Sequence, residues 1–436
     1  MRDENHGHHH GHHHADMLSV EEAFDRIISA FEPLEAEEKP ILESLGQVLA
    51  ADVYSPLDIP PAANSAMDGY ALRHQDLKGA ASGNPVTLKV IGLVAAGQLP
   101  TKRVEPGTTI RIMTGAPVPE GCDTVVPFEE TDEVDRKAQG RGMDEVGVLV
   151  AQPEGKHIRP AGEDVKKGEL VLEKGATLRP SEVGVLASLG LERVRVIRRP
   201  TVAILATGDE LLTPGQKAQP GRIYDSNSYS LSASVLRYGG IPRLLGIARD
   251  NLEDMHRKLE EGLTADLLLT SAGVSKGDYD MVKDVLAERG EVNFWSVRMR
   301  PAKPLAWGML RAPGNRQVPH LGLPGNPVSA MVAFEEFARP AILKMLGKTR
   351  LAKPTIEAEL QGPIVNFDGR RVFARVHVTK SNGAYYANPT GPQGSNILTS
   401  MARANGLAIC PEDEPKMDKG QMVRVKMLDW NEEVGV

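Results

Sequence analysis

The chain has 436 residues, of which 41% are hydrophobic and 25% are charged, as in ordinary folded globular proteins. Its formal net charge of −7 and its 4% of aromatic residues exclude a broad basic or base-stacking surface for nucleic acid. No stretch approaches the roughly 20 consecutive apolar residues of a membrane-spanning helix. At about 150 residues per domain, a length of 436 predicts about three domains.

The cysteine and histidine contents indicate where the protein works. The only two cysteines, Cys122 and Cys410, are far apart, which excludes a disulfide framework and a Cys-x-x-Cys metal site. Residues 1–16 are a His-rich segment, interpreted as an expression tag or as a natural metal-binding tail. No apolar signal-peptide core follows it, so we expect a cytoplasmic protein.

The N-terminal part predicts helices followed by short strands. Ser19 and Glu22 have the spacing of a capping box, and apolar residues follow at helical spacing. Pro40 suits the first turn of a second helix, which we predict through Leu49. β-like runs between Gly and Pro turns then predict strands at residues 86–90, 109–112 and 124–126. Another helix is predicted at residues 181–189.

Between residues 200 and 347, strand-like and helical patterns alternate. The predicted strands are residues 202–206, 244–248, 266–270, 293–299 and 320–323. The predicted helices are residues 228–238, 252–262, 280–289 and 328–346. This alternation predicts a doubly wound α/β domain with a mostly parallel sheet. Strand-like runs at residues 372–379, 407–410 and 422–427 then predict a β-rich C-terminal module.

The loops after the predicted parallel strands are the expected ligand site, because ligands of doubly wound sheets bind outside the carboxyl ends of the strands. Glycines there let the backbone approach a ligand closely, and hydroxyl groups add hydrogen-bond donors. The expected ligand-binding residues of these loops are Thr207, Gly208, Ser271, Gly273 and Ser275. Neither a phosphate-binding P-loop motif nor a dinucleotide fingerprint occurs, so a different nucleotide- or phosphate-bearing ligand is expected.

Carboxylates follow several of the same strands. The acids of this rim are Glu210, Asp225, Asp250, Asp278 and Asp280. One or two carboxylates beside a phosphate suffice for Mg²⁺, so a divalent metal is expected. Alternatively, Asp250 and Asp280 cap helices and Glu210 faces solvent.

Two cations lie close together in Arg300-Pro301-Ala302-Lys303-Pro304, directly after a predicted strand. With Arg375 and Ser395 from the C-terminal module they can form a pocket for a small oxyanion. The alternative is that this basic pair is an ordinary solvated surface.

Eight segments, in order, resemble one family. They are NSAMDGYA, RIMTGAPVP, IRPAGED, ATGDEL, SAGVSKGDYD, MRPAKP, LPGNPVSA and GPQGSN. Together they resemble the molybdopterin molybdenumtransferases, that is, MoeA and the E domain of gephyrin. The resemblance implies a multidomain α/β and β fold. Its parts here would be an N-terminal dimerisation domain (residues 17–55 and 148–180), an inserted β-rich domain (56–147), an α/β molybdopterin-binding domain (181–347) and a C-terminal β-barrel-like domain (350–436).

The resemblance implies that molybdate is inserted into adenylylated molybdopterin, which gives molybdenum cofactor and AMP with the help of Mg²⁺. The substrate's own sulfur atoms would hold the molybdenum, so the protein needs no Cys or His cluster. The implied oxyanion donors are Arg300, Lys303, Ser329, Arg375 and Ser395. The implied Mg²⁺ ligands are Asp250 and Asp280, and the implied catalytic residues are Asp68, Thr114, Glu210, Asp250 and Asp280. Arg159 and Asp164 also fall on family positions, either in the site or as an internal ion pair.

The family subunit works as a homodimer whose cleft combines the third and fourth parts of one subunit with the second part of its partner. Further expected partners are a molybdopterin adenylyltransferase and proteins of molybdoenzyme maturation; neither nucleic acid nor a membrane is expected. A tungstate-inserting paralogue and a gephyrin-like scaffold are the alternative functions.

The chain departs from the family pattern at four positions that concern ligand binding. Ala272 stands where Gly is usual, and Ser296 where a Lys is common. Arg300 replaces a frequent Lys and Ala302 a frequent Gly. Arg keeps the positive charge but changes a point donor into a planar fork, so we expect these changes to alter oxyanion affinity.

Overall fold

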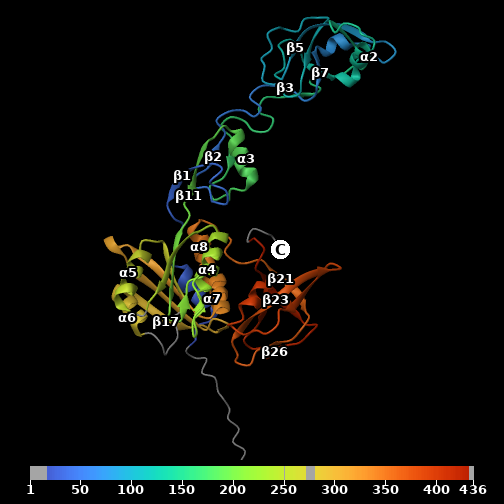
Figure 1. Ribbon diagram of the computed structural model, residues 1–436. Helices are drawn as coiled ribbons and strands as arrows, with labels where there is room; N and C mark the ends of the chain where they lie inside the picture. Colours follow the sequence, from blue (N-terminus) through green and yellow to red (C-terminus); the bar gives the residue numbers. More distant parts are fainter. Residues whose placement is uncertain (1–16, 250, 272–279, 432–436) are drawn as a thin grey trace, which may run out of the picture. The chain divides into compact units, whose positions relative to one another are not determined.

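The computed structural model describes residues 17–249, 251–271 and 280–431. The chain divides into two compact units, which are described separately (Figure 1). The large unit contains Met1–Glu38, Gly46–Val48 and Arg195–Val436, and the small unit contains Lys39–Leu45 and Leu49–Val194. None of the described helices is both long and apolar enough to cross a membrane.

A six-stranded sheet forms the centre of the large unit, in the order β15-β12-β16-β20-β19-β17. Four neighbours are parallel: β15 (Ile241–Ala248), β12 (Thr201–Thr207), β16 (Leu267–Ser271) and β20 (Gln317–Leu323). β19 (Pro304–Arg311) and β17 (Gly290–Ser296) continue the sheet in antiparallel pairs. The predicted mostly parallel α/β sheet is therefore confirmed, whereas strand β19 was not predicted.

Helices cover both faces of this sheet (Figure 1). α1 (Val20–Ile28), α4 (Asn227–Arg237), α7 (Pro327–Ala333) and α8 (Arg339–Met345) pack on one face, and α5 (Leu252–Gly262) and α6 (Asp280–Arg289) on the other. A hydrophobic core lies on each face of the sheet. Successive residues of a strand pack alternately into one core and the other, because side chains of a strand point to opposite faces. Ile204 thus packs in one core and Leu205 in the other.

Two predicted helices of this unit have informative details. The capping box of α1 is present: Glu22 N–H donates to the Ser19 hydroxyl at 3.0 Å, and the Ser19 N–H donates to the Glu22 carboxylate at 2.8 Å. The helix predicted at residues 328–346 is interrupted by a π-helical segment, Phe334–Ala338, between α7 and α8.

The C-terminal module is a closed barrel of five strands. Its strands are β21 (Thr355–Leu360), β23 (Arg371–Ser381), β24 (Ala384–Pro389), β25 (Gly406–Cys410) and β27 (Met422–Met427). The ring closes because β23 pairs with both β24 and β25. The predicted barrel is confirmed. Its short additions are β22 (Ile364–Val365), β26 (Lys416–Met417), α9 (Leu398–Ala402) and β18 (Met299–Arg300), which pairs with β23.

The small unit is built around a five-stranded sheet in the order β7-β4-β6-β5-β8. These strands are β4 (Gly69–Leu72), β5 (Val86–Val94), β6 (Thr108–Ile112), β7 (Thr124–Pro127) and β8 (Glu145–Val148). The other elements are β2 (Val53–Tyr54), β3 (Asn64–Ser65), β9 (Ile158–Arg159), β10 (Leu170–Leu172), α2 (Glu133–Ala138) and α3 (Pro180–Ser188). The three predicted strands and the helix predicted at 181–189 are confirmed.

The second helix predicted from Pro40 to Leu49 is wrong. A strand, β1 (Ala36–Pro40), ends there, and a turn follows it. Of the expected apolar face of Ile41, Leu45 and Leu49, Leu49 is buried, whereas Leu45 is 45% exposed, so these residues do not pack as one helix face. Gly46 then adopts a φ of 80°, which a helix does not allow. The apolar spacing was therefore coincidental. β11 (Arg193–Ile197) also lies outside the predicted elements.

Candidate functional site

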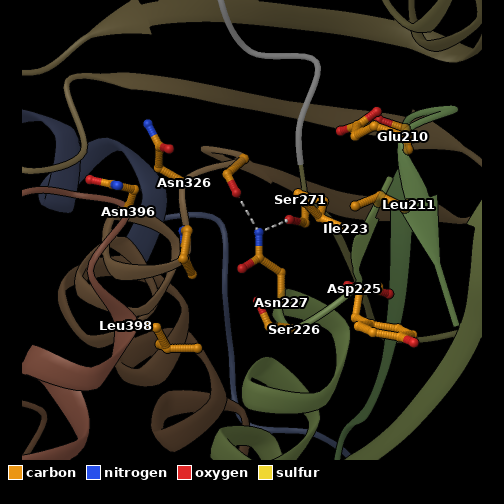
Figure 2. Close-up of a pocket in the computed structure, with 14 residues that line it drawn as sticks. Glu210, Leu211, Ile223, Asp225, Ser226, Asn227, Ser271, Asn326, Asn396 and Leu398 are labelled. Atoms are coloured by element: carbon orange, nitrogen blue, oxygen red, sulfur yellow. Dashed lines mark hydrogen bonds between the residues drawn. The ribbon is translucent and has the colours of Figure 1, made fainter. Parts of the chain in front are cut away.

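The carboxyl ends of the parallel strands open into a cavity of about 350 Å³ (Figure 2). We call it the rim pocket. Its polar lining includes Thr207, Glu210, Asp225, Asn227, Ser271 and Asn326. Four of these six residues were predicted from the sequence: Thr207 and Ser271 as ligand-binding residues, and Glu210 and Asp225 as acids of the rim.

The turn after β12 needs a glycine. Gly208 has a φ of 138°, a conformation that residues with a side chain rarely adopt. A Cβ at this position would also overlap the carboxylate of Glu210, which folds back over Gly208. The Glu210 carbonyl oxygen accepts a hydrogen bond from the Ile223 N–H at 2.9 Å, beside the paired strands β13 (Leu211–Leu212) and β14 (Ile223–Tyr224). Glu210 is exposed at the pocket mouth.

Asn227, the first residue of α4, connects the start of this helix to the ends of two strand segments through hydrogen bonds. Its Nδ2 group donates to the Ser271 Oγ at 2.6 Å and to the Gly325 carbonyl oxygen at 2.8 Å (Figure 2). Nearby, the Asp225 carboxylate accepts the Ser228 N–H at 3.0 Å and so caps the same helix. Asn227 was not predicted as a site residue. Its sequence signal is only its place at the start of a helix, directly after a rim loop.

Several predicted rim residues cannot be placed. Asp250, Gly273, Ser275 and Asp278 lie outside the described residues, as does Ala272. Asp280 begins α6, but its side chain is not described. Across residues 17–249, 251–271 and 280–431, apart from such undescribed side chains, no three His, Cys, Asp or Glu residues gather as a metal site. The Asp250–Asp280 pair therefore stays a prediction.

A larger cavity, of about 690 Å³, lies between the α/β domain and the barrel within the large unit. We call it the cation pocket, because Arg300, Lys303, Arg370 and Arg375 line it. Ser329 and Ser395 line it too, so the structure brings together all five predicted oxyanion donors. Asn326 lines both cavities, which makes the cation pocket a neighbour of the rim pocket.

Arg375 is almost fully buried, with 1% of its surface exposed, and it holds the loop of residues 391–395. Its guanidinium donates to the carbonyl oxygens of Gln393 at 3.1 Å and Gly394 at 2.9 Å, and to the Ser400 hydroxyl at 3.1 Å. Burial lowers the pKa of Arg375 to about 10. Because these described partners are all neutral oxygens, they leave its positive charge uncompensated beside the pocket.

Arg300 is anchored to the barrel. Its guanidinium lies 4.1 Å from the centre of the Phe367 ring and donates to the Val365 carbonyl oxygen. The Asp368 carboxylate lies 3.8 Å from its Nη1 atom. Burial lowers the pKa of Arg300, although Asp368 opposes this shift. Lys303, in contrast, is exposed at the pocket.

The residue between these cations is conformationally strained. Ala302 is buried and has a φ of 76°, in the left-handed region that costs an L-residue free energy. The resemblance described above leads us to expect a Gly at this position, and the positive φ gives the physical reason for that expectation.

Asp68 and Thr114, in the small unit, form a hydrogen-bonded pair. The Asp68 Oδ1 atom accepts the Thr114 N–H and the Thr114 hydroxyl, both at 2.7 Å. These two bonds lower the pKa of Asp68. Arg111 supports the pair, because its Nη1 group donates to the Gly69 and Ile112 carbonyl oxygens at 3.1 Å each.

Arg159 and Asp164 are both exposed in the same unit. In the described part of the chain, no ion pair joins them. Of the two alternatives for these residues, the internal ion pair is therefore wrong, because both side chains face solvent.

Comparison with known proteins places this geometry in a family. Residues 18–190 match the MoeA N-terminal region (domain I and II), residues 203–344 a probable molybdopterin binding domain, and residues 357–428 the MoeA C-terminal region (domain IV). The chain belongs to the MoeA family.

Related proteins and structures agree with this assignment. Molybdopterin molybdenumtransferase 2 of Mycobacterium tuberculosis (strain CDC 1551 / Oshkosh) is 39% identical, over 88% of this chain and 93% of its own. The molybdopterin molybdenumtransferase of Nostoc sp. is 35% identical, over 94% of each chain. A crystal structure of the molybdopterin biosynthesis MoeA protein from Pyrococcus horikoshii OT3 is 30% identical, with a TM-score of 0.73, and covers 94% of this MoeA chain and 100% of that chain.

Proposed function

We propose that this chain is a molybdopterin molybdenumtransferase, which inserts molybdate into adenylylated molybdopterin and releases AMP. Relatives that carry this name match nearly the whole chain. The observation that carries the proposal is that a cation pocket and a rim pocket lie next to each other and share Asn326. One cavity suits an oxyanion, and the other lies where a doubly wound sheet binds its organic ligand.

The cation pocket has the chemistry that a tetrahedral dianion needs. Arg375 contributes a buried positive charge, and Lys303 an exposed ammonium group. Ser329 and Ser395 add hydroxyl donors. Charge-assisted hydrogen bonds to an anion are stronger than neutral ones, so this set would bind molybdate and present it to the sulfur atoms of the substrate.

The rim acids would complete the site. Asp250 and Asp280 would hold Mg²⁺, which when bound neutralises charge on the pyrophosphate. Glu210 stands at the mouth of the rim pocket, where it would orient the AMP end of the substrate.

We infer a homodimer in which Asp68 and Thr114 of one subunit serve the site of the other. Their shared hydrogen bonds keep a carboxylate ionised and fixed, although they belong to a different compact unit from the two pockets. A cytoplasmic location, an adenylyltransferase that supplies the substrate and proteins that receive the cofactor fit this role.

The test is an incubation of the purified protein with adenylylated molybdopterin, molybdate and Mg²⁺. We expect AMP release and a product that activates a cofactor-free molybdoenzyme. Substrate that stays intact would falsify the proposal. Replacing molybdate by tungstate in competition identifies a tungstate-inserting enzyme by the metal content of the product. A dimer that binds a receptor-derived peptide without releasing AMP would instead identify a gephyrin-like scaffold.

A further inference from the structure

The small unit contains a buried carboxylate outside the two pockets. It belongs to Glu133, the first residue of α2, which is 2% exposed. Its Oε2 atom lies 2.9 Å from Nε of Arg111, and its Oε1 atom lies 2.5 Å from Nζ of Lys137. A buried charge is costly unless it is paired, so these two cations are required where they are. The ion pair between Glu133 and Arg111 is therefore a fixed part of the fold.

The guanidinium group of Arg111 is held in one orientation. Glu133 accepts a second contact from it, because Nη2 donates to Oε1 at 3.4 Å. The guanidinium carbon lies 5.2 Å from the centre of the Tyr70 ring and 5.5 Å from the centre of the Phe128 ring. Both distances suit a cation–π interaction. Since the guanidinium is a planar fork, these contacts also fix the direction in which its Nη1 group points.

The Nη1 group points at the ends of the two strands that carry Asp68 and Thr114. It donates to the carbonyl oxygens of Gly69 and Ile112, at 3.1 Å each. These two residues are paired with each other across β4 and β6. Gly69 directly follows Asp68, and Ile112 lies two residues before Thr114. One guanidinium group thus joins the two chain segments at the place where the carboxylate and its donors leave the sheet.

The charge of Arg111 acts on Asp68 as well. The hydrogen bonds from Thr114 are the main cause of the lowered pKa of Asp68, and the positive charge of Arg111 lowers it further. Arg111 therefore affects the carboxylate both through the backbone and through the electric field.

Resting on the proposed function, we propose that Arg111 is a positioning residue of the transferase, which acts through Asp68 and not on the substrate itself. It fixes the carbonyl oxygens of Gly69 and Ile112, so that the Thr114 donors meet the Asp68 carboxylate in a single geometry. Glu133 in turn fixes Arg111. A displacement of about 1 Å can slow a reaction about a hundredfold, so loss of this support should reduce the rate.

The first experiment compares Arg111→Gln with Arg136→Gln. Arg136 is the matched control, because its side chain is 13% exposed, against 16% for Arg111. It also lies in the small unit, where its Nε donates to the Asp132 carboxylate at 2.8 Å. Each variant removes one ion pair of this unit, but it is Arg111 that donates to the strand ends. We expect Arg111→Gln to lower kcat/KM of AMP release by about tenfold or more, and Arg136→Gln by less than about twofold.

The same substitutions in an Asp68→Asn background show whether Arg111 acts through Asp68. If it does, Arg111→Gln lowers the remaining kcat/KM by less than about twofold, because the group that it positions is already lost. An equally large loss in both backgrounds means that Arg111 acts independently of Asp68, and the proposal is wrong. Equal kcat/KM values of Arg111→Gln and Arg136→Gln overturn it too.

A second measurement needs no substrate. Hydrogen–deuterium exchange of the full-length protein reports how firmly Asp68 holds the Thr114 N–H. We expect exchange in the segment 112–116 to become at least about tenfold faster in Arg111→Gln and to stay at the wild-type rate in Arg136→Gln. Exchange that is unchanged in Arg111→Gln overturns the proposal.

Arg111→Lys keeps the proposal testable if Arg111→Gln does not fold. It retains a positive charge beside Glu133 but loses the planar fork, so it should remain folded and still lose most of the rate. A wild-type rate in Arg111→Lys would show that charge alone is sufficient and would overturn the positioning role. Absence of AMP release by the wild type overturns the proposed function, whereas the exchange measurement still decides whether Arg111 holds Asp68 and Thr114 together.

Discussion

Thr114 donates both its N–H and its hydroxyl to the same carboxylate oxygen, Oδ1 of Asp68, at 2.7 Å each. Hydrogen bonds to the charged form stabilise it, so the pKa of this exposed carboxyl lies below its ordinary value. Two loops that are 46 residues apart in the chain are thereby joined at one charged atom.

The hydrogen bonds between Thr114 and Asp68 predict how a substitution shifts the pH dependence of the reaction. Thr114→Val keeps the N–H donor and removes the hydroxyl, so the pKa of Asp68 should rise part of the way toward its ordinary value. If the Asp68 carboxylate must be ionised for activity, the acid side of the kcat/KM profile of AMP release moves to higher pH. Thr114→Ser keeps both donors and should restore the wild-type profile. If the acid limb of the kcat/KM profile does not shift in Thr114→Val, ionisation of Asp68 does not control the activity.

A second prediction concerns the turn that carries Glu210. Gly208→Ala should reduce the rate of AMP release by about tenfold or more, because the new Cβ overlaps the Glu210 carboxylate and displaces it. Gly215→Ala is the matched control: its φ of 94° is also positive, but a Cβ there meets nothing within 4 Å. Both variants should lose about 1 kcal/mol of stability from the backbone alone. Equal rates in the two variants would contradict a role for Glu210.

Most of the large unit could be predicted because its signals are local. Buried strands and amphipathic helices alternate between residues 200 and 347, and each pattern depends only on neighbouring residues. β19 (Pro304–Arg311) was missed because a proline begins it and a glycine interrupts its apolar run. The helix expected from Pro40 failed for the opposite reason. The spacing of Ile41, Leu45 and Leu49 was helical, but Leu49 is buried and Leu45 is exposed, and which of them packs depends on tertiary contacts that the sequence does not show.

In the two pockets too, the sequence predicted which residues come together but not the contacts that they make. Arg300, Lys303 and Arg375 were predicted to share a cavity, and they do. The sequence could not show the contacts that each cation makes. Arg375 donates hydrogen bonds to loop carbonyl oxygens, and the Arg300 guanidinium packs on the Phe367 ring. Asn227 was missed altogether, since its significance lies in which amide atom faces Gly325.

The buried clamp formed by Arg375 predicts a combined loss of stability and substrate affinity. Arg375→Lys keeps the charge but loses the planar fork that binds several carbonyl oxygens, so the loop of residues 391–395 loosens. We expect the free energy of unfolding to fall by about 1–3 kcal/mol and the KM for molybdate to rise. Arg403→Lys, at an exposed site of the same module, should change stability by less than about 0.5 kcal/mol. If the KM for molybdate stays at the wild-type value in Arg375→Lys, the loop of residues 391–395 does not take part in oxyanion binding.

The strained Ala302 predicts that a substitution can stabilise the protein. Ala302→Gly should raise the free energy of unfolding by about 1 kcal/mol, because glycine adopts a φ of 76° without steric cost. Ala312→Gly is the control: Ala312 is also buried, but its φ of −91° is ordinary, so the added chain entropy of glycine should destabilise the protein. Urea unfolding of both variants measures these opposite signs. A destabilised Ala302→Gly would mean that packing of the Cβ outweighs the strain.

His320 predicts how stability depends on pH. It is fully buried, with Nε2 hydrogen-bonded to Thr270, and burial lowers its pKa to about 3. Between this value and the ordinary pKa near 6.5, the unfolded chain binds a proton that the folded protein does not, so stability falls as the pH falls. Lowering the pH from about 6.5 to 5 should cost about 2 kcal/mol from this residue. His320→Gln does not titrate and should show a smaller loss over this range in urea unfolding, even if it is less stable at pH 7. Parallel curves for the two proteins would mean that other groups control acid unfolding.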